Sequence, residues 1–358
     1  MYRVAITGIG MIDTLGNNPK SCYEAYTAEY KDPVRYDWCE IEQYRNQKVF
    51  PVTSELQLPE IHPKTLKTFD NNLKYGIHAV DQALKDSGVE YSDNVAVVAS
   101  NVTAGDGIVS KSIQEIHNVG RIKKPKNFLA GMKDFFPGFI CQHYGFTGLS
   151  VAMNAACATS LFNIDYAMRI VDEYDYVVCA TSDVPINVLA VPFFSGLSAL
   201  GTKSTPFKEG RDGFIPGDGA GCFILESEER AKARGAKIHA YLYPVGFGSD
   251  AHSAIAPSPC GNGAKIAMSK ALNGIDKVDF VVAHGTSTPL GDDVEMEAIK
   301  SILGDVEVIA PKRRIGHTIA AAGILSAIYG IMKLKKGKFL NNSFGFGGKC
   351  ASQVVEII

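Results

Sequence analysis

Two hydrophobic patterns alternate along the chain. Short runs of apolar or small residues, bounded by glycine and polar residues, predict strands buried on both faces, because such strands show no polar alternation. Between them, apolar residues recur every three or four positions, the period of a helix with one buried face. Strands are predicted at residues 4–9, 95–100, 149–156, 176–181, 222–226 and 280–283, and the clearest helix at 65–87. This alternation predicts an α/β fold in which sheets and helices form layers.

The same order of elements occurs twice. In residues 1–236, a strand is followed by a helix, a second strand, and a strand that leads into a strongly apolar helix after Cys157. In residues 237–358 the order repeats, and the segment around His317 takes the place of the segment around Cys157. The halves share little sequence identity, so the duplication rests on the pattern alone. It predicts two domains of similar plan, 1–236 and 237–358.

The apolar helix of the second half resembles a membrane span in one respect. Residues 315–332 contain no residue of fixed charge, and the segment has almost the length of a span. The segment is rich in alanine and glycine, however, and Lys333, Lys335 and Lys336 follow it, as basic residues follow ordinary helices. We therefore predict no membrane span and place both apolar helices in the middle of the protein, with a sheet on each side.

Composition narrows the classes of function. The 36 Lys and Arg residues nearly balance 38 Asp and Glu residues, so the net charge of −2 creates no field that would recruit nucleic acid or an acidic membrane. The eight cysteines include no C-x-x-C pair, which is typical of reduced thiols in the cytoplasm. The opening residues, MYRVAITGIG, lack the features of a signal peptide. The sequence thus predicts a cytoplasmic protein.

Three reactive side chains stand where predicted elements change. Cys157 lies at the turn from a strand into a helix, where free N–H groups and the helix dipole favour an anion, so we expect its thiol pKa to be lowered. His284 follows the strand at 280–283, and His317 opens the second apolar helix. Each alone has a plain structural interpretation, as a buried thiol or a satisfied polar residue. Their matching places in a duplicated plan indicate a common site.

A cysteine and two histidines allow several chemistries. A metal site is disfavoured because ligand pairs such as C-x-x-C or H-x-x-x-H are missing from the sequence. A protease-like dyad leaves one histidine without a role, and no G-x-S-x-G motif indicates a serine hydrolase. Carbon–carbon bond formation on thioesters uses all three residues, since the cysteine carries an acyl group while two neutral imidazoles stabilise an enolate.

The motifs around these residues resemble those of the elongating β-ketoacyl-acyl carrier protein synthases of the thiolase superfamily, which use a Cys-His-His triad. The resemblance covers nearly the whole chain. Its motifs are ACATS at 156–160, RDGFIPGDGAG at 211–221, AHGTSTPLGDDVE at 283–295, KRRIGHTIAAAG at 312–323 and NSFGFGG at 342–348. It implies the thiolase fold, with two pseudo-symmetric halves in a five-layer α-β-α-β-α sandwich. It also implies condensation of a Cys157-bound acyl group with malonyl-acyl carrier protein.

The resemblance also assigns roles to particular residues. Cys157 would be the nucleophile, His284 and His317 would serve decarboxylation and condensation, and Lys312 would support the site. The N–H groups of Cys157 and Phe346 would form the oxyanion hole. Thr286 and Thr288 match positions that hold the pantetheine arm, and Asp250 and Glu295 match acids behind the site. No cofactor is implied beyond the phosphopantetheine of the carrier protein. The implied assembly is a homodimer, or a heterodimer with a related subunit, joined through the strand before Cys157.

Two other functions remain open on the sequence. A thiolase acting on acyl-CoA would need a second cysteine near the C-terminus, and Cys350 stands just after GFGG. A non-catalytic chain-length subunit would typically replace the cysteine that is present here as Cys157. The loop between Leu200 and Phe207 is shorter than in the family, and residues 337–341 replace a long excursion. These departures leave the acyl chain undefined.

Charge suggests where the acidic carrier protein docks. Lys64 and Lys67 match the family's docking region, and a basic run provides Arg121, Lys123, Lys124 and Lys126.

Inside the site, the glutamate that relatives place near the lysine matching Lys312 is Ser326 in this chain. A buried ammonium without a carboxylate is unfavourable. We therefore expect Glu295 to be the nearest carboxylate to Lys312, within about 4 Å.

Overall fold

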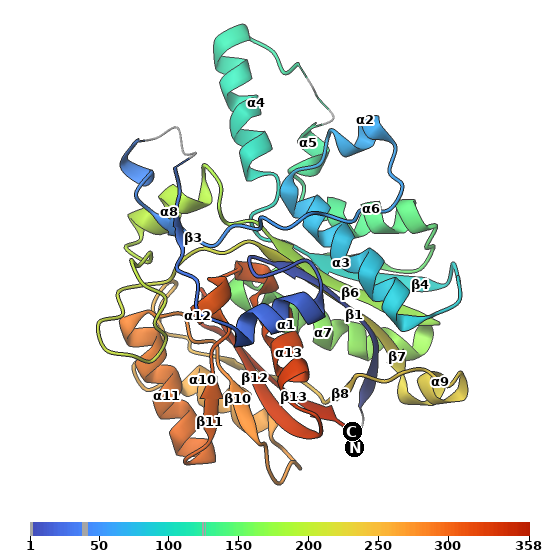
Figure 1. Cartoon of the computed structure of the whole chain (residues 1–358), viewed down its shortest axis with the longest axis vertical. Helices are drawn as coiled ribbons and strands as arrows, with labels where there is room; N and C mark the ends of the chain where they lie inside the picture. Colours follow the sequence, from blue (N-terminus) through green and yellow to red (C-terminus); the bar gives the residue numbers. More distant parts are fainter. Residues whose placement is uncertain (1–2, 38–41, 124, 126) are drawn as a thin grey trace.

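The computed structural model describes residues 3–358 except 38–41, 124 and 126. Its first half contributes five strands to one sheet, in the spatial order β1-β7-β6-β4-β5 (Figure 1). Here β1 and β7 are antiparallel, as are β7 and β6, whereas β6, β4 and β5 are parallel. The strands are β1 (Val4–Asp13), β7 (Gly219–Ser227), β6 (Tyr176–Asp183), β4 (Val95–Ser100) and β5 (Ser150–Val151). All residues of β1, β4 and β6 are buried, which explains their unbroken apolar runs.

The second half builds a matching set of strands, in the order β11-β10-β12-β13, with β9 also paired to β13. Strand β8 pairs with β1 on one side and β13 on the other, so one continuous sheet of eleven strands runs through both halves. The strands are β8 (Ala240–Leu242), β9 (Gly246–Ser249), β10 (Phe280–Val282), β11 (Glu307–Ile309), β12 (Gly337–Gly345) and β13 (Lys349–Ile357).

Helices complete the five layers. The two apolar helices, α7 (Thr159–Ile170) and α13 (Ala322–Lys333), pack against each other in the same core, between the two halves of the sheet. The outer face of the first half is covered by α3 (Asn71–Ser87) and α6 (Phe135–Tyr144). The outer face of the second half is covered by α10 (Asn262–Ala271) and α11 (Pro289–Leu303). The predicted layer order and the place of the apolar helices are confirmed.

Three predicted elements differ from the structure. The helix at 65–87 is two helices, α2 (Pro63–Leu66) and α3, because the Asp70 carboxylate accepts the Leu73 N–H at 3.0 Å and caps α3 there. The predicted buried strand at 149–156 shrinks to β5, an edge strand whose Ser150 is exposed. Residues 315–332 are interrupted before α13, since Gly316 and Ile319 have positive φ angles of 71° and 41°.

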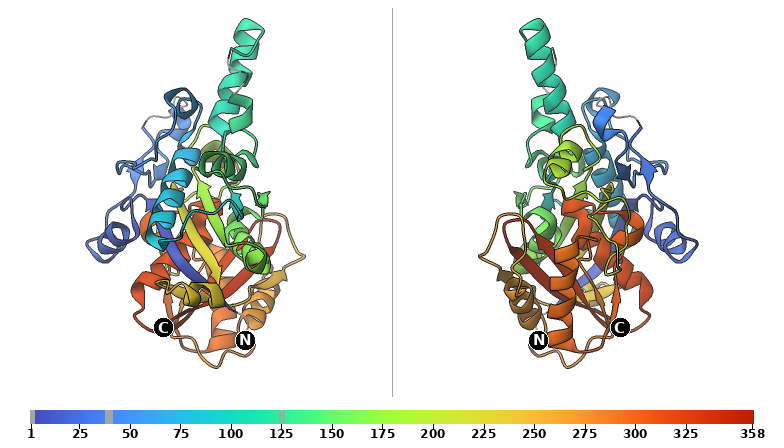
Figure 2. Two further views of the ribbon diagram at one scale, coloured as in Figure 1. Left: turned by 90° about the vertical axis from the view of Figure 1, so that its right-hand side faces the viewer. Right: turned by 90° about the vertical axis from the view of Figure 1, so that its left-hand side faces the viewer.

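The remaining elements are helices and short strands outside these layers. They are α1 (Pro19–Thr27), β2 (Val34–Arg35), β3 (Lys48–Val49), α4 (Asp106–Val119), α5 (Asn127–Ala130), α8 (Ala190–Gly196), α9 (Glu228–Ala233) and α12 (Lys312–Ile315). Helix α4 projects away from the body of the protein (Figure 2). Among the described residues, no helix is both long enough and apolar enough to cross a bilayer.

Candidate active site

Cys157 lies in a single 3-10 turn, Ala156–Ala158, that leads into α7. Ala156 enters this turn with a φ of 51°, and Ile319 enters the equivalent turn, Ile319–Ala321, with a φ of 41°. By this equivalence Cys157 corresponds to Ala320, and His317 lies three residues earlier. The Ser343 hydroxyl donates to the Cys157 carbonyl oxygen at 2.7 Å. The second half of the chain therefore fixes the backbone that carries the thiol.

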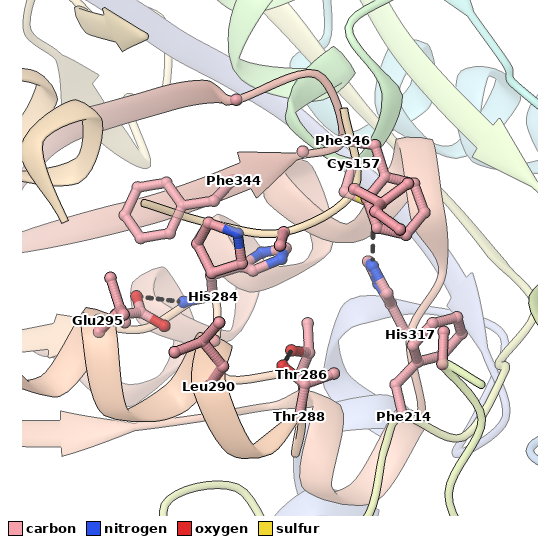
Figure 3. Close-up of a pocket in the computed structure, with 18 of the residues that line it drawn as sticks. Cys157, Phe214, His284, Thr286, Thr288, Leu290, Glu295, His317, Phe344 and Phe346 are labelled. Atoms are coloured by element: carbon pink, nitrogen blue, oxygen red, sulfur yellow. Dashed lines mark hydrogen bonds between the residues drawn. The ribbon is translucent and has the colours of Figure 1, made fainter. Parts of the chain in front are cut away.

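Both predicted histidines lie at this thiol (Figure 3). The Nε2 atom of His317 is 3.1 Å from the Cys157 Sγ atom. The His284 ring lies 5.4 Å from the His317 ring, measured between centroids, with an angle of 85° between the ring planes. The Phe214 ring packs edge-on against His317 at 5.1 Å. Residues separated by 160 positions in the sequence thus form one cluster.

A carboxylate behind His284 holds its backbone in place. The two Glu295 oxygens accept the N–H groups of His284 at 2.7 Å and Gly285 at 2.8 Å. Asn342 donates its side-chain amide to the same carboxylate at 3.1 Å. Burial nevertheless raises the pKa of Glu295, because the charged form loses its water.

The prediction that Lys312 and Glu295 form a contact ion pair is wrong. Lys312 Nζ instead donates to the His284 carbonyl oxygen at 2.6 Å, and within the described part of the chain it has no carboxylate within 4.0 Å. Burial lowers the pKa of Lys312, whereas the charge of Glu295 opposes this shift more than any other carboxylate does. Glu295 therefore acts on Lys312 through space, and the direct contact goes to a backbone carbonyl.

The expected lowering of the Cys157 pKa is also wrong. Burial raises it to about 12, outweighing the nearby Lys312 charge and the N–H groups of Cys157 and Phe346, all of which lower it. Burial likewise lowers the pKa values of His284 and His317 well below 6.5, and the Lys312 charge adds to this effect. At neutral pH the site therefore contains a thiol and two uncharged imidazoles.

The close approach of the β12 end to Cys157 depends on a glycine. A Cβ atom on Gly345 would lie 2.7 Å from the Ala155 carbonyl oxygen, so a side chain there would push the two segments apart. The next residue, Phe346, directs its N–H to the thiol, and its ring lies 6.4 Å from the Phe194 ring. Two N–H groups, one from each half of the chain, thus point to the Cys157 sulfur atom.

The cluster lines a mostly apolar cavity with a volume of ≈ 410 Å³. Thr286 and Thr288 also line it, and their hydroxyl oxygens lie 3.0 Å apart. Cys350 lines the same cavity and is buried on β13, so the second cysteine considered from the sequence is indeed nearby. Asp250 lies outside the lining: its carboxylate accepts the N–H groups of Ser258 at 3.0 Å and Gly263 at 2.9 Å. It thereby anchors the loop that supplies Ile255 to the wall.

Comparison with known proteins identifies this architecture. The model of the family "Beta-ketoacyl synthase, N-terminal domain" matches residues 1–231, and "Beta-ketoacyl synthase, C-terminal domain" matches residues 239–343. The chain belongs to the β-ketoacyl synthase family. It is 32% identical to 3-oxoacyl-acyl-carrier-protein synthase 2 of Vibrio cholerae over 93% of this chain and 86% of the relative. It is 33% identical to the enzyme of the same name from Staphylococcus aureus N315, over 94% and 86%.

Solved structures confirm the thiolase-type fold of this synthase. One is a type II polyketide ketosynthase in complex with its acyl-carrier protein and bound to a hexaketide, with a TM-score of 0.90, 22% identity and full coverage of both chains. Another is a β-ketoacyl synthase from Burkholderia phymatum, with a TM-score of 0.88, 23% identity and full coverage. The ishigamide ketosynthase/chain length factor also has a TM-score of 0.88, with 23% identity over 100% of this chain and 99% of that chain.

The sequence did not predict a role for Asp183, an acid that joins the two halves of the synthase. Asp183, at the end of β6, is fully buried and accepts the Thr103 N–H at 2.8 Å and the Ala320 N–H at 3.0 Å. It therefore ties the turn before α13 to the first half of the chain. Its position after an apolar strand, in Thr181-Ser182-Asp183, was the only available signal.

Proposed function

We propose that this synthase catalyses the decarboxylative Claisen condensation of an acyl group, held as a thioester on Cys157, with malonyl-acyl carrier protein. The product is a β-ketoacyl-acyl carrier protein of fatty acid or polyene/polyketide synthesis. The observation that carries the proposal is the cluster of Cys157, His317 and His284 on one wall of an apolar cavity. The apolar cavity suits an acyl chain, and the cluster supplies a nucleophile and two neutral donors.

Acyl transfer begins with a protonated thiol. As Cys157 Sγ attacks the carbonyl carbon of the acyl thioester, its proton passes to His317 Nε2, 3.1 Å away. The negative charge on the carbonyl oxygen is stabilised by the N–H groups of Cys157 and Phe346. The carbon–sulfur bond to the carrier then breaks and the leaving thiolate takes a proton from solvent. His317 becomes neutral again by losing its Nδ1 proton, so Nε2 keeps the N–H group that condensation uses. Cys157 is left as the acyl thioester.

Condensation uses the two imidazoles as hydrogen-bond donors. They donate to the thioester carbonyl of the malonyl group, while its carbon–carboxylate bond breaks and CO₂ leaves. The electron pair of that bond becomes an enolate, which attacks the carbonyl carbon of the Cys157 thioester. Cys157 leaves as a thiolate and is reprotonated. Lys312 and Glu295 act indirectly, since both contact the backbone of His284.

The pKa values of the histidines predict a flat pH profile for malonyl decarboxylation. A lowered pKa means that each imidazole is uncharged at all pH values above it, so the charge state of each ring changes only when the pH falls through the lowered pKa. In a Cys157→Ala variant, which removes the thiol from the titration, the histidines should add no step to the CO₂ release rate from about pH 6 to 7.5. A step near pH 7 belongs to Glu295, because burial raises its pKa to about 7. A midpoint near pH 6.5 in this range contradicts the assignment.

The substrate-binding roles follow from the lining of the cavity. Thr286 and Thr288 are assigned to the phosphopantetheine arm of the carrier, because both line the cavity beside the histidines and their hydroxyl oxygens lie 3.0 Å apart. No further cofactor is required by this chemistry. Asp250 supports the loop that supplies Ile255 to the lining.

We expect the carrier protein to dock on exposed lysines at α2. Lys64 and Lys67 are both exposed, as are Arg121 and Lys123 after α4, whereas Lys124 and Lys126 lie outside the described residues. The double change Lys64→Glu and Lys67→Glu should raise KM for the acidic carrier about 10-fold and spare small acyl thioesters. The matched control is Lys277→Glu, an exposed lysine of the second half. Equal loss with both substrates indicates misfolding and contradicts a docking role.

We also propose that the synthase forms a dimer through β5, with an identical subunit or a related one. Among the described residues, β5 ends the sheet with one unpaired edge, and α6 contacts both β5 and the α4 arm, defined as α4 and α5. The arm exposes Ile113 (51%), Ile116 (47%) and Phe128 (68%). Several large apolar side chains exposed on one arm are typical of an interface.

The proposed interface can be tested by measuring the mass of the synthase in solution by light scattering. Ile113→Asp with Ile116→Asp should shift the synthase from dimer toward monomer, because burying two carboxylates in an interface is strongly unfavourable. The control is Ile266→Asp, a residue of α10 with 44% exposure. An unchanged mass for the arm variant, or equal dissociation of the control, contradicts the interface.

The alternative function is a thiolase reaction on acyl-CoA. It needs a second cysteine at the site, and Cys350 lines the cavity. The two functions differ in the second substrate. With an acyl-carrier protein and malonyl-carrier protein, the proposed enzyme forms a product two carbons longer and releases one CO₂ per condensation. Condensation with acetyl-CoA in place of the malonyl substrate, without CO₂, supports a thiolase instead.

We further propose a cytoplasmic location, since all described cysteines are free thiols.

A further inference from the structure

Arg314 links the short helix α12 to the C-terminal end of helix α1 (Figure 1). Its two terminal nitrogens, Nη1 and Nη2, each donate two hydrogen bonds, and all four acceptors are backbone carbonyl oxygens of one short segment. These are the carbonyl oxygens of Tyr26 at 2.7 Å, Ala28 at 2.7 Å, Ala25 at 3.1 Å, and Glu29. The guanidinium thus binds a segment that lies almost the whole length of the chain away.

The end of α1 is suited to a cation from elsewhere in the fold. The last carbonyl groups of a helix lack partners within the helix and carry its partial negative charge, and α1 has no basic residue in its own last turn. The helix is itself fixed, because the Tyr26 ring lies 4.7 Å from the Tyr329 ring of α13, measured between centroids. The Tyr329 hydroxyl in turn donates to the buried Asp13 carboxylate at 2.6 Å. Arg314 therefore attaches α12 to a well-anchored element.

Helix α12 needs such attachments, because it has only four residues and ends at Gly316 with a φ of 71°. A helix of this length has no stability of its own. The Ser204 hydroxyl donates to its first carbonyl oxygen, that of Lys312, at 2.9 Å. The Lys312 ammonium donates to the His284 carbonyl oxygen at 2.6 Å, and Arg314, two residues later, provides the contacts with α1. One short helix thus connects the reactive centre to α1.

We propose that Arg314 is a positioning residue, which holds α12 so that the Lys312 ammonium stays on the His284 carbonyl oxygen. Its importance for the rate rests on the proposed function. Arg314 does not line the catalytic cavity, so its effect reaches the reaction only through the residues that α12 carries. Small displacements of the groups that support a reactive centre have large effects on the rate, whereas binding of a substrate along the rest of the cavity is unaffected.

Replacing Arg314 with alanine should lower kcat for CO₂ release from malonyl-carrier protein about 10-fold and leave KM within about 2-fold. Arg314→Lys should restore kcat to within about 3-fold of the wild type, since an ammonium has three donors for the same carbonyl oxygens. The matched control is Arg313→Ala, which removes the same charge from the same helix. Arg313 is exposed, and its guanidinium lies 5.7 Å from the centroid of the Tyr30 ring. This control should keep kcat within about 2-fold.

A double-mutant cycle with Lys312→Met distinguishes positioning from general stabilisation. If Arg314 acts through the Lys312 ammonium, Arg314→Ala should lower kcat less than about 2-fold further once that ammonium is absent. A stabilising role without this coupling gives the same loss in both backgrounds. Circular dichroism and thermal melting establish that each variant is folded at the assay temperature.

Alkylation of Cys157 by iodoacetamide at pH 8, followed by peptide mass spectrometry, repeats the cycle without any substrate. The Lys312 charge lowers the thiol pKa, so Arg314→Ala should slow alkylation about 3-fold, and neither Arg313→Ala nor the Lys312→Met background should show this loss. Equal losses in the Arg313 control, additive losses in the cycle, or an unchanged alkylation rate overturn the proposal. If the wild-type chain releases no CO₂, the proposed function fails, and the alkylation cycle still decides whether Arg314 positions Lys312.

Discussion

Replacing Cys157 with alanine is expected to reduce β-ketoacyl formation at least about 10⁴-fold, while decarboxylation of malonyl-carrier protein continues. The thiol is the acyl acceptor, so condensation has no electrophile without it. The two imidazoles that stabilise the enolate lie on other segments and keep their uncharged state. Product analysis by mass spectrometry and CO₂ release from labelled malonyl carrier measure the two activities separately.

The matched control for this experiment is Cys350→Ala. Cys350 is buried in the wall of the same cavity, so the change has comparable effects on packing. Its condensation rate should stay within a few-fold of the wild type. A large loss in Cys350→Ala together with residual condensation in Cys157→Ala contradicts the assignment of the nucleophile and supports the thiolase alternative.

His317→Ala is expected to lower both partial reactions, each by about 10²- to 10⁴-fold. For acyl transfer, the change removes the atom that lies 3.1 Å from Sγ and takes its proton. For decarboxylation, it removes one of two donors to the developing enolate. Stopped-flow acyl transfer and CO₂ release provide the two rates.

His317→Asn separates the two roles of this histidine. Its side-chain amide keeps an N–H donor but cannot take a proton at neutral pH. Decarboxylation should therefore recover in part, whereas acyl transfer stays near the rate of the alanine variant. If His317→Ala still releases CO₂ at the wild-type rate, the donor role is wrong. If asparagine restores acyl transfer, the proton-transfer role is wrong.

The strands that were predicted correctly are those buried on both faces. β4 and β6 have continuous apolar runs because helices cover the sheet on each side. The stretch at 149–156 has a similar run, yet only β5 forms, because it ends the sheet and has a neighbour on one side only. Hydrophobicity alone cannot distinguish a strand covered by its own chain from a free edge. The boundary between the halves at residues 236 and 237 stays a prediction.

The residues of the site were predictable, but their electrostatics were not. Cys157, His284 and His317 stand in motifs at ends of elements, and the fold brings them together. The pKa of Cys157 was predicted in the wrong direction because burial, which outweighs the favourable N–H groups, cannot be read from the sequence. The partner of Lys312 was wrong for a similar reason: a backbone carbonyl carries no sequence signal. Asp183 was missed because the N–H groups that donate to it lie far away in the chain.

The position of the acyl group tests the central claim most directly. The synthase is incubated with acyl-carrier protein in the absence of malonyl substrate, quenched in acid, digested and examined by tandem mass spectrometry. The account predicts one acyl thioester per chain, on the peptide that contains Cys157. It also predicts that subsequent addition of malonyl-carrier protein removes this adduct and yields the β-ketoacyl product. An acyl group found on Cys350, or an adduct on Cys157 that malonyl-carrier protein fails to discharge, contradicts the account.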